Sequence, residues 1–303
     1  MNSKQTYSWP ILALISNALM WGLIWWPLRE LRLNGWHPLW STMTVFFLTA
    51  AGFSLYRPKA WSGMWRSPAL WLIGLVSGLT NAAFNWGMAT GDVVRVILLF
   101  YLMPVWAVLL ARIFLKEAVT PTALLRIALA LTGAFLVMKP AGGGLPIPSS
   151  LADWLGLAGG MAFAATNVAL RKGAALPRDS RAMAMFLGGV VIPCVLAAGL
   201  TSVSAMTFPS VPDGYVLALL AGSGLMMLYA NLALQYAAVR LPVNITVVVM
   251  LSEVVFATVS SLLIDATELT GGMIVGGALI LSASALATLE KGGPAKAPAD
   301  KPG

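Results

Sequence analysis

Ten long apolar runs with few charged side chains constrain the fold of this chain more than any other feature. Only 10% of the 303 residues are charged and 59% are hydrophobic, whereas soluble domains carry about 25% charged residues. A hydrocarbon core ~30 Å thick needs about 20 apolar residues per helix, which is the length of these runs. They cover residues 10–28, 36–56, 68–90, 93–115, 119–138, 154–170, 182–203, 214–238, 242–264 and 270–289. Because such runs are too long and continuous for barrel strands, the sequence predicts an all-α polytopic membrane protein with ten transmembrane helices.

The second half of the chain repeats the pattern of the first half. Residues 81–137 align with residues 231–287 at a constant offset of 150 without a gap, and 10 of the 57 positions are identical. With five helices per half, the second copy must enter the membrane from the opposite side. The alignment therefore predicts two inverted five-helix repeats around a central cavity, the arrangement of many transporters.

Glycine and proline content sets the expected domain boundaries. Residues 140–152 are rich in both and mark a linker, while residues 291–303 are rich in Gly, Pro, Ala and Lys and are expected to form a disordered cytoplasmic tail. The first five-helix repeat then covers residues 1–139 and the second covers residues 153–290.

The net charge of +8 is an orientation signal. With the N-terminus inside, 15 of the 19 Lys and Arg residues fall on the inner side, and the outer side holds Arg29, Arg32, Arg95 and Lys139. This asymmetry predicts a multi-pass protein of the cell inner membrane with both termini in the cytoplasm, and it gives no reason to expect nucleic acid as a partner. Arg95, Arg112 and Arg126 lie near span ends, where we expect them to extend toward the lipid headgroups.

Catalytic and metal chemistry find no support in the sequence. The chain has one cysteine, Cys194, and one histidine, His37, which is too few for a zinc site or a Cys–His nucleophile pair. We therefore expect no enzyme, no catalytic residue, no metal and no cofactor. Three G-x-x-x-G pairs occur in spans 3, 6 and 10, and we expect them to pack within a monomer, with a homodimer as the alternative.

Amide side chains inside spans are the first candidates for a substrate site. Asn81 and Asn85 lie four residues apart and share one face of the third span, and the repeat places Asn231 and Gln235 at the same positions in the eighth span. A carboxamide donates and accepts hydrogen bonds, which suits a zwitterion. The two pairs are thus predicted to form facing walls of one site; the alternative is interhelical hydrogen bonding without a ligand.

Aromatic residues of the first span form a second candidate group. Asn17, Trp21 and Trp25 are spaced by four residues, and a separate alignment at an offset of 142 places Phe163 and Asn167 of the sixth span opposite the two indoles. One amide and two indoles could bind a flat apolar side chain by stacking. Aromatic residues that simply face the core or the lipid remain the alternative.

The fourth and ninth spans contribute a candidate gate and a carboxylate. Pro104 follows Tyr101 and removes a backbone hydrogen bond, so a moving kink and an inert kink are both open. Glu253 is the carboxylate at the middle of a span, where it must face the interior, be paired or be protonated. It is interpreted either as a proton-coupling or ammonium-binding group, or as a neutral carboxyl bonded to a neighbouring helix.

Several of these motifs resemble a known family. Residues 101–105 (YLMPV), residues 114–117 (FLKE) and the helix start at Thr120–Pro121 are similar to EamA-type exporters of the drug/metabolite transporter superfamily, and residues 252–257 (SEVVFA) are similar to the second-half version of the helix-4 signature. Family members commonly have Glu-Pro-Val there, and this chain lacks the proline. The opening at residues 7–10 (YSWP) and the Trp-rich first half are most similar to the YddG-type aromatic amino acid exporters. The resemblance implies alternating access through a central cavity and export of aromatic and related amino acids.

The leading hypothesis is therefore an inner-membrane exporter of amino acids that prefers aromatic ones. Multidrug or organic-cation efflux is the first alternative, and Glu253 would then have to act alone because residues 5–28 contain no acid. Sugar-phosphate exchange ranks lower, since no Lys or Arg lies near the middle of a span. A non-transporting membrane receptor or assembly factor is the alternative from a different class, although the loops are short.

Overall fold

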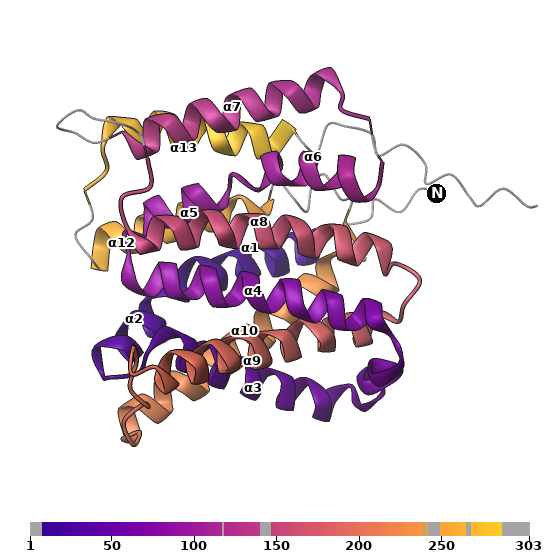
Figure 1. Ribbon diagram of the computed structural model, residues 1–303, viewed down its shortest axis with the longest axis vertical. Helices are drawn as coiled ribbons and strands as arrows, with labels where there is room; N and C mark the ends of the chain where they lie inside the picture. The colour runs from indigo at the N-terminus through magenta and orange to yellow at the C-terminus, as the bar shows by residue number, and fades with distance from the viewer. Residues whose placement is uncertain are drawn as a thin grey trace, which may run out of the picture.

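The computed structural model describes residues 8–116, 118–139, 147–238, 240–241, 249–264 and 268–286, and in these residues it contains helices and no strand. The first half contains α1 (Ser8–Leu23), α2 (Trp25–Leu33), α3 (Pro38–Tyr56), the short helices η1 (Pro58–Trp61) and η2 (Met64–Arg66), α4 (Pro68–Thr90), α5 (Val93–Phe100), α6 (Met103–Phe114) and α7 (Pro121–Met138). The second half contains α8 (Leu151–Lys172), α9 (Arg178–Ser202), α10 (Gly214–Ala238), α12 (Ser252–Ile264) and α13 (Gly271–Leu286). Figure 1 shows these helices packed as one bundle. The all-α polytopic fold predicted from the sequence is confirmed.

Helix starts follow from local sequence. Helices α3, α4 and α7 begin with a proline, whose missing N–H and fixed φ suit the first turn. Asp92, Thr120 and Ser150 precede α5, α7 and α8, and each side chain accepts a hydrogen bond from a backbone N–H of the first turn. These caps satisfy N–H groups that would otherwise be left without partners in the membrane.

Two of the expected spans are broken. The first divides into α1 and α2 at Ile24, and the fourth divides into α5 and α6 at Tyr101 and Leu102. Pro104 lies in the first turn of α6, so it starts a new helix and does not bend a continuous one. The break therefore places Tyr101 in non-helical backbone inside the bundle.

Length and hydropathy support a membrane location. Among the described residues, six stretches are long and apolar enough to cross a bilayer, and a seventh is added if η1 and η2 are joined to α4 despite a bend of 108°. Helices α12 and α13 are shorter apolar helices. For the ninth span, residues 242–248 lie outside the described part of the chain.

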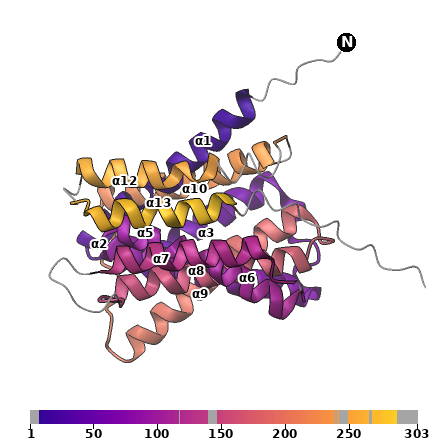
Figure 2. The same cartoon turned by 90° about the horizontal axis from the view of Figure 1, so that it is seen from above.

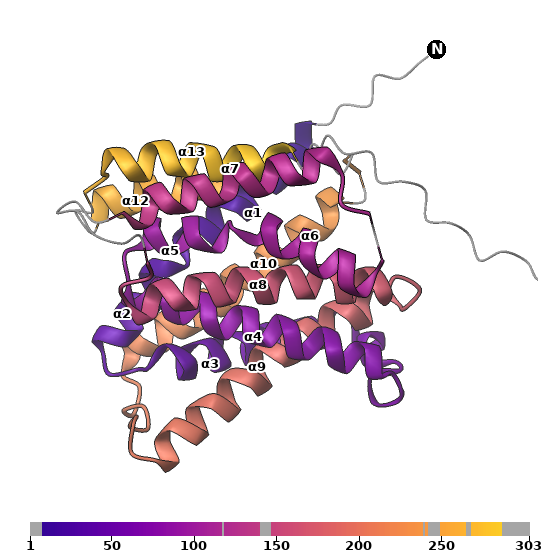
Figure 3. The same ribbon diagram turned by 45° about the horizontal axis from the view of Figure 1, so that its top comes forward.

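The helix contacts are symmetric under exchange of the two halves. Helix α4 packs against α8 and α9, and its counterpart α10 packs against α1 and α3. The pairs α7–α13 and α3–α9 are their own counterparts and lie at opposite ends of the bundle (Figures 1 and 3). Helices α1 and α8, the first of each half, run in opposite directions (Figure 1). This is the pairing expected of two inverted repeats. The boundaries of the two repeats stay predictions, since residues 140–146 of the linker and the tail after residue 286 lie outside the described residues.

Each G-x-x-x-G pair packs against a neighbouring helix of the same chain. A Cβ atom at Gly74 would lie 3.0 Å from the Ala184 carbonyl oxygen of α9, and one at Gly156 would lie 2.9 Å from the carbonyl oxygen of Val96. In the tenth span, Gly272 and Gly276 meet the backbone of α7 in the same way. Figure 2 shows α13 alongside α7. The expected packing within the chain is confirmed, because the missing side chains let the backbones approach.

Candidate functional site between the two halves

The break in the fourth span brings together two predicted residues from opposite halves. The Tyr101 hydroxyl donates a hydrogen bond to Oε2 of Glu253 over 3.4 Å, and both side chains are buried. Glu253 lies in the first turn of α12. The buried carboxyl therefore has a partner, as the membrane environment requires.

Helix α1 covers this pair through a close backbone approach. A Cβ atom at Gly22 would lie 2.9 Å from the Glu253 carbonyl oxygen and 2.7 Å from Cβ of Phe256. One turn further on, the Trp25 indole N–H donates to the Ser260 hydroxyl over 2.9 Å. Gly22 and Ser260 were not predicted from the sequence. The available signal for a close helix contact was that small residues recur along α12.

Trp25, the first residue of α2, is completely buried and its indole N–H is occupied, so it joins the start of α2 to α12. The Arg29 guanidinium lies 5.0 Å from the centre of the Trp25 ring. This contact adds a cation–π interaction at the end of the buried side chain. Trp21, one turn earlier, is only partly buried and packs against the same core.

Next to Tyr101, the Phe100 ring is the centre of a cluster of aromatic rings. The Phe100 ring lies 4.5 Å from the Phe84 ring, 5.4 Å from the Phe163 ring and 6.0 Å from the Tyr101 ring, measured between centroids. These rings come from α4, α5 and α8 and from the break between α5 and α6. A buried carboxyl and a phenol hydroxyl beside an aromatic cluster could bind an ammonium group next to a flat apolar side chain. Phe84 and Phe100 were not predicted.

The predicted amides separate into different environments. Asn17 is fully buried and its Nδ2 donates to the Ala230 carbonyl over 2.6 Å, while its Oδ1 has no partner among the described residues. Asn85 is buried, and its Oδ1 also lacks a partner within that part of the chain. Asn81 is partly buried and bonds to the Ser77 carbonyl of its own helix over 2.9 Å.

In the second half, Asn231 is partly buried, and Asn167 is exposed one turn beyond Phe163. The side chain of Gln235 lies outside the described residues. Because α4 packs against α8 and α9 whereas α10 packs against α1 and α3, the predicted walls belong to different helix pairs. That they face one another across a substrate stays a prediction.

An ion pair joins the start of α5 to the start of α8. Both guanidinium nitrogens Nε and Nη2 of Arg95 donate to the Asp153 carboxylate of α8, over 2.8 and 2.9 Å. The backbone N–H of Ser149 donates to the same carboxylate over 2.8 Å. A buried carboxylate on the neighbouring helix thus offers Arg95 a bidentate partner, and Arg126 is buried as well. That these side chains reach the lipid headgroups stays a prediction. Asp153 was not predicted, although an acid at a helix start was the available signal.

No three His, Cys, Asp or Glu side chains gather as metal ligands within the residues that the structure describes. A groove lies between α4 and α9, and neither Tyr101 nor Glu253 lines it. None of the predicted substrate-site residues lines this groove.

Comparison with known proteins indicates which family and fold this chain resembles. Residues 8–139 match the model of the EamA-like transporter family, so the first half of the chain carries an EamA-like domain. A solved structure titled "Crystal structure of protein" has a TM-score of 0.60 at 19% sequence identity, covering 93% of this chain and 97% of that chain. At this identity the likeness shows a shared fold alone.

No curated protein matches the chain. The fold is that of a multi-pass membrane protein, and the family match over residues 8–139 suggests a membrane transporter. They do not distinguish the aromatic amino acid exporters from other members, so this narrower resemblance stays a prediction.

Proposed function

We propose that this protein exports amino acids, with a preference for aromatic ones, by alternating access between its two halves. The observation that carries the proposal is the Tyr101–Glu253 pair beside the cluster of Phe84, Phe100 and Phe163. Glu253 would hold the substrate ammonium, and the rings would pack against its side chain. Trp21, partly buried against the same core, would complete the apolar wall.

The carboxylate of an amino acid needs N–H donors. In the proposed site these come from the predicted amides, above all Asn85, which is buried on α4. Asn17, Asn81, Asn167, Asn231 and Gln235 complete the proposed set. Their amides can donate and accept, so they can satisfy the polar end of a zwitterion without adding a charge to the bilayer.

The broken fourth span supplies the proposed moving part. Helix α6 starts afresh at Met103 and Pro104, so it can change its angle to α5 without breaking a continuous hydrogen-bond ladder. We also propose that the protein lies in the inner membrane with both termini in the cytoplasm, since this orientation places most of its Lys and Arg residues on the cytoplasmic side.

Flux into proteoliposomes tests the proposal. Saturable uptake of phenylalanine and tryptophan, faster than that of glutamate and spermidine, is the expected result. If the protein moves no amino acid while it remains folded by size-exclusion chromatography, the proposal is wrong.

Efflux of organic cations is the second candidate, and the buried carboxyl of Glu253 favours it. In this case spermidine or an aromatic cation would be transported and phenylalanine would not. Glu253→Gln would then abolish cation flux. The same flux assay therefore separates the two functions.

A further inference from the structure

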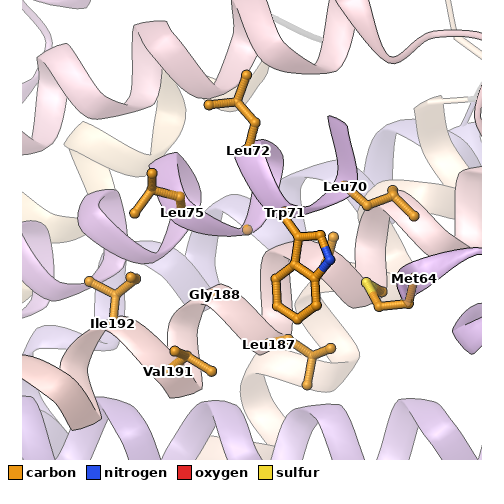
Figure 4. Close-up of a pocket in the computed structure, with 11 residues that line it drawn as sticks. Met64, Leu70, Trp71, Leu72, Leu75, Leu187, Gly188, Val191 and Ile192 are labelled. Atoms are coloured by element: carbon orange, nitrogen blue, oxygen red, sulfur yellow. The ribbon is translucent and has the colours of Figure 1, made fainter. Parts of the chain in front are cut away.

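A groove on the outer surface of the bundle lies outside the proposed substrate site. It has a volume of about 340 Å³ and runs between the first turns of α4 and the first half of α9. Its lining consists of apolar side chains and glycine from the segment before α4, from α4 and from α9. Figure 4 shows Met64, Leu70 and Trp71 toward one end of the groove and Val191 and Ile192 toward the other.

The groove exists because two glycines let the helix backbones touch. Gly188 packs against the carbonyl group of Gly74, so its floor has no side chain. The walls are Leu75, Trp71 and Val191, which are 46%, 45% and 47% exposed. An apolar trough that opens outward from a membrane protein meets lipid chains, and it can hold one without losing any polar contact.

The mouth of the groove is basic. Arg181 lies three residues before Ala184 and seven before Gly188, so it shares the groove-lining face of α9. Its Nε is buried and has no partner among the residues described. A buried guanidinium N–H without an acceptor is costly and suits an anionic ligand.

The segment before α4 adds charge at the same end. Arg57, Lys59 and Arg66 lie there and are exposed, and the Ser180 hydroxyl of α9 donates to the Ser62 carbonyl, which holds the start of α9 against this segment. Arg178 at the first residue of α9 is a further cation, and Asp179 is the acid among them. Five basic residues against one acid make this end of the groove electropositive.

Tryptophan rings place the mouth at the level of the headgroups. Trp65 and Trp71 lie 5.5 Å apart between ring centroids, and both are exposed. Tryptophan favours the interface between the hydrocarbon and the headgroups. The apolar trough thus extends into the hydrocarbon, while its basic end lies where a phosphate would be.

We propose that this groove binds one anionic phospholipid, with an acyl chain between α4 and α9 and its phosphate at Arg181. A second copy of the chain fits less well, because the same basic mouth on both copies would bring like charges together. Clusters of basic residues beside a span favour anionic lipids in this way. The proposal does not depend on what the protein transports.

Lipid binding to the purified protein tests the proposal. Native mass spectrometry in a neutral detergent measures the retention of phosphatidylglycerol and of phosphatidylcholine with the same chains. We expect phosphatidylglycerol to bind about tenfold more tightly, because phosphatidylcholine adds a choline cation that the basic residues at the mouth repel. Equal binding of the two lipids would overturn the proposal.

Two pairs of variants locate the site. Arg181→Gln should remove most of the preference for phosphatidylglycerol, whereas Arg240→Gln, whose guanidinium packs on the Tyr236 ring, should keep it. Val191→Phe should fill the groove and weaken both lipids, whereas Val195→Phe, one turn further along α9 and 62% exposed, should not. If both members of a pair bind the lipids alike, or if the groove variants alter the oligomeric state of the protein and not its lipid binding, the lipid site is not at this groove.

Discussion

Among the described residues, two Tyr–Glu hydrogen bonds have nearly the same length in opposite surroundings. The Tyr101 hydroxyl donates to Glu253 over 3.4 Å where both side chains are buried between the two halves. The Tyr215 hydroxyl donates to Glu30 over 3.3 Å at an exposed helix end. The chemistry is the same, so the difference between the two pairs isolates the effect of burial.

In the exposed pair, water can take the place of either partner, so the bond contributes little. In the buried pair, neither group can be left alone without a large desolvation cost. A ligand that enters between Tyr101 and Glu253 must therefore bring donors for both the carboxylate and the Tyr101 oxygen, and an ammonium group has three N–H donors. In the proposed function, burial is therefore what would let the inner pair select a substrate, whereas the outer pair is open to water.

The packing around the inner pair changes at the break in the fourth span. Seven of the eight residues of α5 are buried, whereas only Pro104 and Val105 are buried among the twelve residues of α6. The Arg95–Asp153 ion pair fixes the packed end. Tyr101 of the buried pair therefore lies between the tightly packed α5 and the loosely packed α6.

The largest loss of stability is expected from forcing apart α1 and α12, whose contact helps to bury the Tyr101–Glu253 pair. Gly22→Leu places a side chain against the Glu253 carbonyl and Phe256, and overpacking of this kind costs about 3 kcal/mol. Gly199→Leu, with open space at its Cβ, is the control. Thermal unfolding in detergent should show a lower midpoint for the first variant alone; equal midpoints would mean that the contact is not tight.

Removing the ion pair at the packed end should come next. Asp153→Asn leaves the Arg95 guanidinium without its carboxylate, and breaking a buried pair costs about 3 kcal/mol. Glu268→Gln removes an exposed acid and should leave the unfolding midpoint unchanged. A similar small shift in both variants would show that the ion pair contributes no more than a surface charge.

The glutamates themselves give the next comparison. Glu253→Gln should slow phenylalanine uptake about 10- to 100-fold, because a charge-assisted hydrogen bond contributes about 1.5–3 kcal/mol. Glu30→Gln should change uptake less than twofold. Equal rates for the two variants would remove Glu253 from the proposed site. The measurement is initial uptake into proteoliposomes with matched protein content.

The tyrosines give the smallest effect. Tyr101→Phe keeps the ring and removes one hydrogen bond, which contributes about 1 kcal/mol, so uptake should fall about fivefold. Tyr215→Phe should leave uptake unchanged. If Tyr101→Phe transports at the wild-type rate, the hydroxyl takes no part in substrate binding and only Glu253 remains.

The sequence predicted the helices well because hydropathy and proline act locally. The run at residues 68–90 coincides with α4, and the run at residues 214–238 coincides with α10. Pro104 signalled a disturbance in the fourth span, but a proline starts a helix as readily as it bends one. Whether α5 and α6 would be continuous depended on packing that no local pattern contains.

The site could be predicted only in part, because its contacts join residues far apart in the chain. Tyr101 and Glu253 were found because polar groups are rare in spans, but their hydrogen bond crosses 152 positions. Asp153 was missed for the same reason, since its partner Arg95 lies on another helix. Gly22 carries no chemistry of its own, and its role becomes visible only against the backbone of α12.

Competition by substrate analogues tests the central claim, that Glu253 selects the substrate ammonium beside the aromatic cluster. Uptake of labelled phenylalanine into proteoliposomes would be measured against unlabelled phenylalanine and 3-phenylpropionate, which lacks the ammonium, in the wild type and in Glu253→Gln. The account predicts that 3-phenylpropionate competes at least about tenfold less well than phenylalanine in the wild type, and that this difference shrinks in the variant because the two changes remove the same contact. Equal competition by the two compounds in the wild type, or an unchanged difference in the variant, would contradict it.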